Sequence, residues 1–243
     1  MNLIEHTFSP TRLFVLWQAA DGHDRSHFVI GELRDESGMI SFRYLPESED
    51  FRKAVELGFV CYPAFRKRDR VYTEGVMDTF LRRLPPRKRG DFTKYLEQWR
   101  LPATAPLSDF ALLAYSGGKL PTDGFSVIWP LDEVKAPGEV LLEVAGFRYQ
   151  GIGVSELSVG MPVFFVPEPD NKFDPQALRV EAGGKRVGYV KRQQHDAVAD
   201  WLEQYHLEAF IERFNGTAER PVMYLFCRLT QRKPDSLPRS AFG

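Results

Sequence analysis

A short segment near the middle of the chain is the feature that most constrains its fold. Residues 130–139 (PLDEVKAPGE) combine charged residues with two prolines and a glycine. Prolines and glycines interrupt helices and strands, so such a stretch is typical of a boundary. It divides the 243 residues into two parts of about ordinary domain size. We therefore expect one domain over residues 1–134, a second over residues 135–232, and a polar tail over residues 233–243.

The composition is that of a globular protein, with 43% hydrophobic and 27% charged residues. No apolar run approaches the roughly 20 residues that span a bilayer, and the first ten residues do not resemble a signal peptide. We expect a cytoplasmic protein without a membrane partner. The formal net charge is −1, whereas a protein that coats duplex DNA non-specifically is usually basic. Any nucleic-acid site must therefore be local.

The first domain is predicted to begin with strands and to continue with helices. Residues 28–33 and 39–44 flank a glycine-containing turn, which indicates a β-hairpin. Residues 92–99 place apolar side chains at helical spacing after Asp91, a plausible N-cap. Ser108 is expected to cap a second helix that ends at the glycine pair 117–118.

The second domain is predicted to be mostly strand. Residues 140–147, 162–166, 177–181 and 185–190 are strand candidates, and residues 182–184 (AGG) form a hairpin turn between the last two. An amphipathic helix around Val198 and Trp201 and two closing strands follow. The predicted fold class is α+β: a mixed hairpin and helix domain, then a small antiparallel β-barrel of the OB or SH3-like kind with one helix.

The sequence contains no complete catalytic or metal-binding motif. Residues 183–185 (GGK) lack the spacing of a phosphate loop. Residues 170–181 imitate a calcium loop, but Lys172 and Pro175 occupy positions that require a ligand and a glycine. Two distant cysteines and five scattered histidines give no ligand set. We expect a protein that is not an enzyme and that has no cofactor and no metal. A metal-dependent nuclease that uses Asp170 and Asp174 is the weakest alternative.

Three motifs in the second domain occur in a characteristic order. They are residues 146–151 (GFRYQG), residues 168–178 (EPDNKFDPQAL) and residues 187–192 (VGYVKR). This pattern resembles the HIRAN domain, over residues 140–232. The resemblance implies an OB-like module that captures the free 3′ end of single-stranded DNA. Members of that family occur alone in bacteria or fused to fork-remodelling ATPases, so the resemblance implies roles such as DNA repair or phage defence.

The residue types in these motifs suit that chemistry. Three aromatic side chains can stack on unpaired bases, and three cations can contact phosphate. Asn171 is more typical of a turn than of base recognition. The predicted site consists of Arg148, Tyr149, Asn171, Phe173, Asp174, Tyr189, Lys191 and Arg192.

Asp174 is the most informative of these residues. A carboxylate repels a phosphate backbone unless it accepts a hydrogen bond, and a terminal 3′-hydroxyl is a donor that internal sugars lack. Asp174 could instead only brace a turn, Phe173 could belong to the core, and Tyr189 could lie on either face of its strand. Phe173 also departs from the tyrosine that is commoner in the family, and so lacks its hydroxyl.

The first domain carries a second resemblance, over residues 12–128. Residues 30–33 (IGEL), 41–44 (SFRY), 80–87 (FLRRLPPR) and 109–114 (DFALLA) resemble the N-terminal accessory subdomain of HipA-type serine/threonine kinases. The catalytic residues of that family lie in a later domain, for which we expect no counterpart in these 243 residues. The resemblance implies a docking or regulatory module, antitoxin-like or otherwise, for a separately encoded kinase or repair protein.

One region of the first domain is locally basic. Residues 66–100 contain eleven Lys or Arg against five Asp or Glu, a net charge of +6. The region is either a solvated face or a surface for phosphate or an acidic partner. The predicted secondary surface consists of Arg82, Arg83, Arg87, Lys88 and Arg89.

The favoured hypothesis is non-catalytic binding of single-stranded DNA, at free 3′-hydroxyl ends, by the second domain. The first alternative is a regulatory or antitoxin-like subunit that docks a kinase. The sequence does not decide whether the first domain binds DNA or protein.

Overall fold

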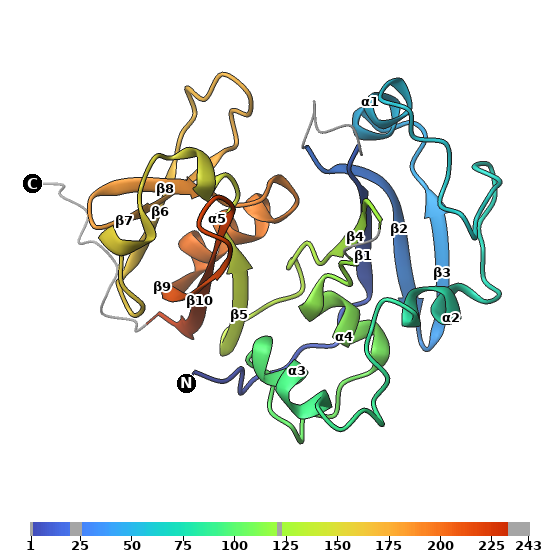
Figure 1. Ribbon diagram of the computed structural model, residues 1–243, viewed down its shortest axis with the longest axis horizontal. Coiled ribbons are helices and arrows are strands. Elements are labelled where there is room, and N and C mark those ends of the chain that lie inside the picture. The colour runs from blue at the N-terminus through green and yellow to red at the C-terminus, as the bar shows by residue number, and fades with distance from the viewer. Residues whose placement is uncertain (1, 20–25, 121–122, 233–243) are drawn as a thin grey trace, which may run out of the picture. The chain divides into compact units, whose positions relative to one another are not determined.

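A computed structural model describes residues 2–19, 26–120 and 123–232 (Figure 1). It divides into two compact units. The N-terminal unit is Phe8–Pro130, and the C-terminal unit combines the segment up to Thr7 with the residues from Leu131 onward. All strand pairs in the described residues are antiparallel and the helices are few, so the predicted α+β class is confirmed. The predicted tail, residues 233–243, lies outside the described residues.

The N-terminal unit is built on one four-stranded sheet in the order β3-β2-β1-β4. The predicted hairpin is present, and its two-residue turn, Ser37-Gly38, has positive φ at both positions. This geometry matches the right-handed twist of the flanking strands. The strands are β1 (Arg12–Trp17), β2 (Phe28–Glu36), β3 (Met39–Tyr44) and β4 (Phe125–Ile128).

Four short helices accompany this sheet. The predicted cap of the last helix is present, because the Ser108 hydroxyl accepts a hydrogen bond from the Ala111 amide at 3.0 Å and Gly117 ends the helix in the left-handed conformation. Asp91 stands at its predicted N-cap position but makes no side-chain cap bond there. The helices are α1 (Glu49–Glu56), α2 (Val76–Leu81), α3 (Phe92–Gln98) and α4 (Asp109–Ser116).

Aromatic side chains form the centre of the N-terminal unit. Phe42 on β3 is fully buried, and its ring centroid lies 4.8 Å from those of Tyr44 and Phe65. The Tyr44 hydroxyl donates to the Phe65 carbonyl at 2.5 Å and accepts from the Tyr62 amide at 2.7 Å. The aromatic packing and these two hydrogen bonds therefore fix the loop that follows α1 onto the sheet.

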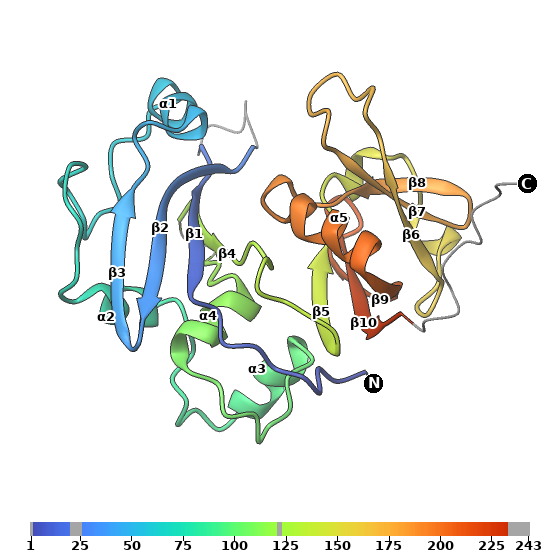
Figure 2. The ribbon, with the colours of Figure 1, turned by 180° about the vertical axis from the view of Figure 1, so that it is seen from behind.

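The C-terminal unit is a small antiparallel β-barrel, in which isolated bridges connect two sheets (Figures 1 and 2). Two three-stranded sheets, β5-β10-β9 and β6-β7-β8, join at both edges. Pro162 bridges to Phe210, and Ala145 bridges to Tyr189. The strands are β5 (Gly138–Glu143), β6 (Val163–Pro167), β7 (Leu178–Ala182), β8 (Lys185–Tyr189), β9 (Tyr205–Gly216) and β10 (Pro221–Gln231).

Short helical segments connect these strands. The helix α5 (His195–Gln204) precedes β9 and buries Val198 and Trp201, as its amphipathic pattern predicted. The single-turn segments are η1 (Phe147–Tyr149), η2 (Val154–Glu156) and η3 (Arg192–Gln194). None of the helices in the described part of the chain has the length and hydrophobicity needed to cross a membrane.

Gly188 explains why one motif position must be glycine. A Cβ atom there would lie 2.4 Å from the Ala145 carbonyl oxygen, and the φ of Gly188 is 144°. Any side chain would separate β8 from the segment after β5 and open the barrel.

The N-terminal segment was predicted to belong to the first domain, but residues up to Thr7 group with the C-terminal unit. Two buried carboxylates hold it. Glu212 accepts from Asn2 at 2.8 Å, and Glu139 accepts from the amides of Glu5 and His6 at 3.0 Å. These partners lie more than 130 residues away in the sequence, so no local pattern indicated them.

Arg83 was predicted to belong to an exposed basic surface, and this prediction is wrong. Its side chain is only 2% exposed. It forms a two-point ion pair with Asp123, at 2.9 and 2.8 Å, and donates to the carbonyls of Gly118 and Phe125. Arg83 therefore joins the end of α2 to the start of β4.

We predict that Arg83→Leu lowers the free energy of unfolding of the N-terminal unit by about 3 kcal/mol. The substitution leaves Asp123 and two carbonyls without their donor. Because Asp123 is partly exposed, we expect a loss near the lower end of the roughly 3–5 kcal/mol that breaking a buried ion pair costs. Hydrogen exchange measured by mass spectrometry reports on this unit separately. The exposed neighbour offers a control, because Arg82→Leu should change the stability by less than about 0.5 kcal/mol. Equal losses in both variants would contradict the structural role of Arg83.

Candidate nucleic-acid interface

The turn after β5 presents Tyr149 to solvent. Phe147 anchors it, since its side chain is buried and its ring lies 5.8 Å from that of Phe214. Tyr149 is 65% exposed, and the Arg148 guanidinium lies 4.6 Å from the centre of its ring. The turn therefore displays an aromatic face and a cation side by side, a combination that suits bases and phosphate.

The loop between β6 and β7 is organised by Asn171. Its side-chain oxygen accepts hydrogen bonds from the amides of Phe173 and Asp174, at 3.0 and 3.1 Å. This is the Asx turn that the sequence favoured over base recognition. The turn projects Phe173 outward, with 98% of the residue exposed. A core position for Phe173, which the sequence left open, does not occur.

Asp174 makes a turn contact and also faces a histidine. One carboxylate oxygen accepts from the Gln176 amide at 2.9 Å. The other lies 3.8 Å from Nε2 of His195, a buried residue at the start of α5. The Nδ1 atom of His195 lies 2.8 Å from the Asp196 carboxylate.

Tyr189 and Glu168 connect the loop to the sheet. The Tyr189 hydroxyl donates to Glu168 at 2.9 Å, and the Asn171 amide nitrogen donates to the same carboxylate oxygen at 2.5 Å. These two bonds, with the Arg179 guanidinium at 3.2 Å, hold the pKa of Glu168 below its ordinary value. Burial and then the Glu168 carboxylate raise the pKa of Tyr189, so its hydroxyl remains a donor.

Arg186 extends these contacts to the first turn. Its Nε donates to the Gln150 side chain at 2.9 Å, and one terminal nitrogen donates to the Tyr189 hydroxyl at 3.1 Å. One hydrogen-bonded network therefore joins the turn that carries Tyr149 to the loop that carries Phe173 and Asp174.

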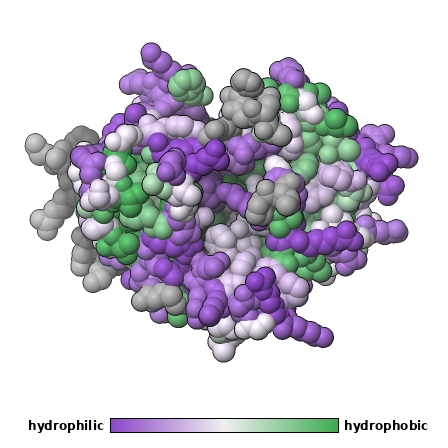
Figure 3. All heavy atoms as spheres, viewed as in Figure 1, coloured by the Kyte–Doolittle hydropathy of each residue, from purple (hydrophilic) through white to green (hydrophobic). Residues whose placement is uncertain are grey.

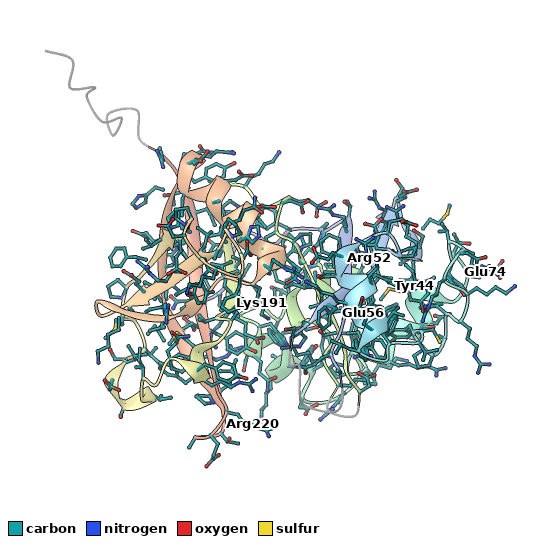
Figure 4. All side chains as sticks on the ribbon, turned by 90° about the horizontal axis from the view of Figure 1, so that it is seen from above. Tyr44, Arg52, Glu56, Glu74, Lys191 and Arg220 are labelled. Carbon is teal, nitrogen blue, oxygen red and sulfur yellow. The ribbon has the colours of Figure 1, made fainter. Side chains whose placement is uncertain are left out.

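The two predicted cations after β8 differ in their surroundings. Lys191 is half-buried, and its Nζ lies 3.0 Å from the Glu143 carboxylate on β5 (Figure 4). Arg192 is exposed at the start of η3. Arg192 is thus the more accessible of the two to a phosphate.

The remaining residues of the predicted basic surface lie between α2 and α3 of the N-terminal unit. Arg82, Arg87, Lys88 and Arg89 are exposed. Arg87 pairs with Asp109 at 2.6 Å, and Arg89 pairs with Asp91 at 2.5 Å. These ion pairs offset part of the positive charge that the sequence count indicated.

The sequence did not assign a role to four residues of this region. Glu168 stood in a quoted motif, Arg186 and His195 lay just outside the chosen cations, and Phe164 lay in a strand. Phe164 on β6 is 63% exposed, and Figure 3 shows hydrophobic side chains gathered over the region of β6 and β7. Strand alternation could have indicated the outward position of Phe164, since its neighbours Val163 and Phe165 are buried.

Comparison with known proteins finds a family model that matches this part of the chain. Residues 137–227 match the model of the HIRAN domain, in agreement with the resemblance of the three motifs. The HipA-like resemblance of residues 12–128 stays a prediction. No curated protein matches the chain.

Two solved structures are similar to the chain. The HIRAN domain of human HLTF is 23% identical, with 37% of this chain and 74% of that chain covered, at a TM-score of 0.32. A protein from Lactobacillus plantarum is 24% identical, with 37% and 92% covered, at a TM-score of 0.31.

We predict that Asn171→Ala loosens the β6–β7 loop and lowers the free energy of unfolding by about 1 kcal/mol, the usual net contribution of such hydrogen bonds. The amides of Phe173 and Asp174 lose their acceptor, so their hydrogen exchange, followed by NMR, should accelerate. Lys172→Ala serves as the control, because it leaves the Asx turn intact. Unchanged exchange at both amides in Asn171→Ala would show that the turn does not depend on this side chain.

Proposed function

We propose that this protein binds single-stranded DNA at free 3′-hydroxyl ends and that the site does not catalyse a reaction. The binding surface is the pair of turns that carry Tyr149 and Phe173, together with Asp174. The observation that carries the proposal is the exposure of both aromatic side chains on turns that one hydrogen-bonded network joins.

The exposed aromatics suit unpaired bases. A phenylalanine side chain is ordinarily buried, yet Phe173 is almost fully exposed to solvent on a turn that Asn171 holds. Stacking on a base contributes about 1–3 kcal/mol and accepts any base, because every base has a π-face. Tyr149, with Arg148 beside its ring, offers a second such face.

The Asp174 carboxylate suits a terminal hydroxyl. One of its oxygens accepts from the Gln176 amide at 2.9 Å, and the other lies 3.8 Å from Nε2 of His195. A 3′-hydroxyl supplies a donor for this carboxylate, whereas a 3′-phosphate brings further negative charge.

The local cations supply the attraction to phosphate that the overall charge of −1 does not. Arg148 and Arg192 are the proposed phosphate contacts, with Lys191 held by Glu143 beside them. Asn171 and Tyr189 act by holding the turns.

For the N-terminal unit, docking of a separately encoded kinase or repair protein stays a prediction. So does a contact of its basic segment with DNA. Roles in DNA repair, phage defence or a toxin–antitoxin system also stay predictions. The nuclease alternative has a direct test, which is cleavage of the same oligonucleotides after addition of Mg²⁺.

We predict that the protein prefers a 3′-hydroxyl end to a 3′-phosphate end by about tenfold to more than a hundredfold, from a charged hydrogen bond of about 1.5–3 kcal/mol. Asp174→Asn should reduce this preference, mainly because a 3′-phosphate then binds better. Asparagine keeps an oxygen for the Gln176 amide, so the turn is preserved. Fluorescence anisotropy with matched oligonucleotides measures both affinities.

Tyr149→Ala provides the contrasting variant. It should weaken both ends alike, because stacking does not sense the terminal oxygen. Equal binding of both ends by the folded wild-type protein would disprove end recognition.

We predict that Arg192→Ala lowers the slope of log affinity against log salt concentration by about 0.7, the value for one lost phosphate contact on a single strand. Arg220→Ala is a matched control. That exposed arginine adjoins the start of β10 and lies apart from Lys191 (Figure 4). Equal slopes in wild type and Arg192→Ala would show that Arg192 does not contact a phosphate of the bound DNA.

A further inference from the structure

Glu168 holds three side chains that come from different parts of the barrel. One carboxylate oxygen accepts from Asn171 in the loop and from Tyr189 on β8, at 2.5 and 2.9 Å. The other accepts from Arg179 on β7 at 3.2 Å. Glu168 itself follows β6 directly, and its backbone pairs with Ala177 and Asn171 across the base of the loop.

The contact with Asn171 fixes the orientation of that side chain. An asparagine amide has a donor end and an acceptor end, and a carboxylate can bind only the donor end. Because Glu168 holds the nitrogen, the oxygen faces the amides of Phe173 and Asp174. A rotated amide would leave both backbone donors without this acceptor.

The contact with Tyr189 extends the arrangement to the second turn. Tyr189 accepts from Arg186, and Arg186 donates to Gln150, the residue after Tyr149. The Glu168 carboxylate therefore lies at the junction between the two turns.

We infer that Glu168 is a positioning residue for recognition of the DNA end, and this inference rests on the proposed function. Glu168 itself does not contact the DNA. It presents Asp174 and Phe173 in one fixed geometry relative to Tyr149, so that the loop need not be ordered when DNA binds. Pre-ordering of this kind increases affinity and selectivity without adding a contact.

The test compares Glu168→Gln with Glu181→Gln. Both glutamates bind Arg179, but Glu181, at 2.8 Å, lies on β7 outside the loop and serves as the matched control. The measured quantity is the ratio of affinities for 3′-hydroxyl and 3′-phosphate oligonucleotides. In Glu168→Gln this ratio should fall by about tenfold, as for one charged hydrogen bond. In Glu181→Gln it should equal that of wild type.

A donor–acceptor exchange separates positioning from stability. Asn171→Asp keeps an oxygen for the two backbone amides but sets a carboxylate against Glu168, so the ratio should fall. In the double variant Glu168→Gln with Asn171→Asp, the introduced glutamine amide donates to the introduced carboxylate, and the ratio should recover. If each substitution only destabilised the protein, the two losses would add, and the double variant would not recover the ratio.

The outcomes distinguish the two proposals. A wild-type preference that Glu168→Gln retains would overturn the positioning role and leave end recognition standing. A wild-type protein without any preference would overturn end recognition, and the positioning role with it. Loss in both single variants without recovery in the double variant would also overturn the positioning role.

Discussion

Two backbone hydrogen bonds between Ala145 and Tyr189, of 2.8 and 2.9 Å, are the constraint on which the candidate site depends. They close the barrel between the segment after β5 and the end of β8. The same pairing brings the turn that starts at Gly146 next to Tyr189 and to the cations that follow it. Gly188 permits this approach, since a side chain there would collide with Ala145. The pairing that closes the barrel therefore also brings the two parts of the candidate site together.

Several charged side chains on the barrel are paired with one another or with polar groups. Glu168, Arg179, Glu181 and Arg186 form a connected set in which each charged group has an opposite or polar partner. Arg83 and Arg192 differ in burial. Arg83 is enclosed by Asp123 and two carbonyls and stabilises its unit, whereas Arg192 is exposed at the start of η3.

Much of the architecture could be predicted from local sequence. Runs rich in apolar residues indicated the strands of the barrel, and turn residues such as Gly183-Gly184 indicated its hairpin, because these signals depend only on neighbouring residues. The strand β4 and the helices α1 and α2 were not predicted. The strand β4 has only four residues and α1 only eight, so each is too short to show a clear hydrophobic period.

The members of the site could be predicted, but the hydrogen bonds among them could not. The motif spacing identified the turns of Tyr149 and Phe173, and the chemistry of asparagine indicated the Asx turn. The burial of Arg83 depends on a tertiary neighbour, Asp123, which lies 40 residues away in the sequence. The role of Glu168 depends likewise on strand register, which brings Tyr189 and Arg179 to it from two other strands.

The most direct test of the account is an NMR titration with a single-stranded trinucleotide that ends in a 3′-hydroxyl. If the two turns form the binding surface, backbone amide shifts should change at residues 147–150, 168–176 and 189–192, with the largest changes at Phe173 and Asp174. Shifts confined to the N-terminal unit, or saturable binding without shifts in these segments, would contradict the account.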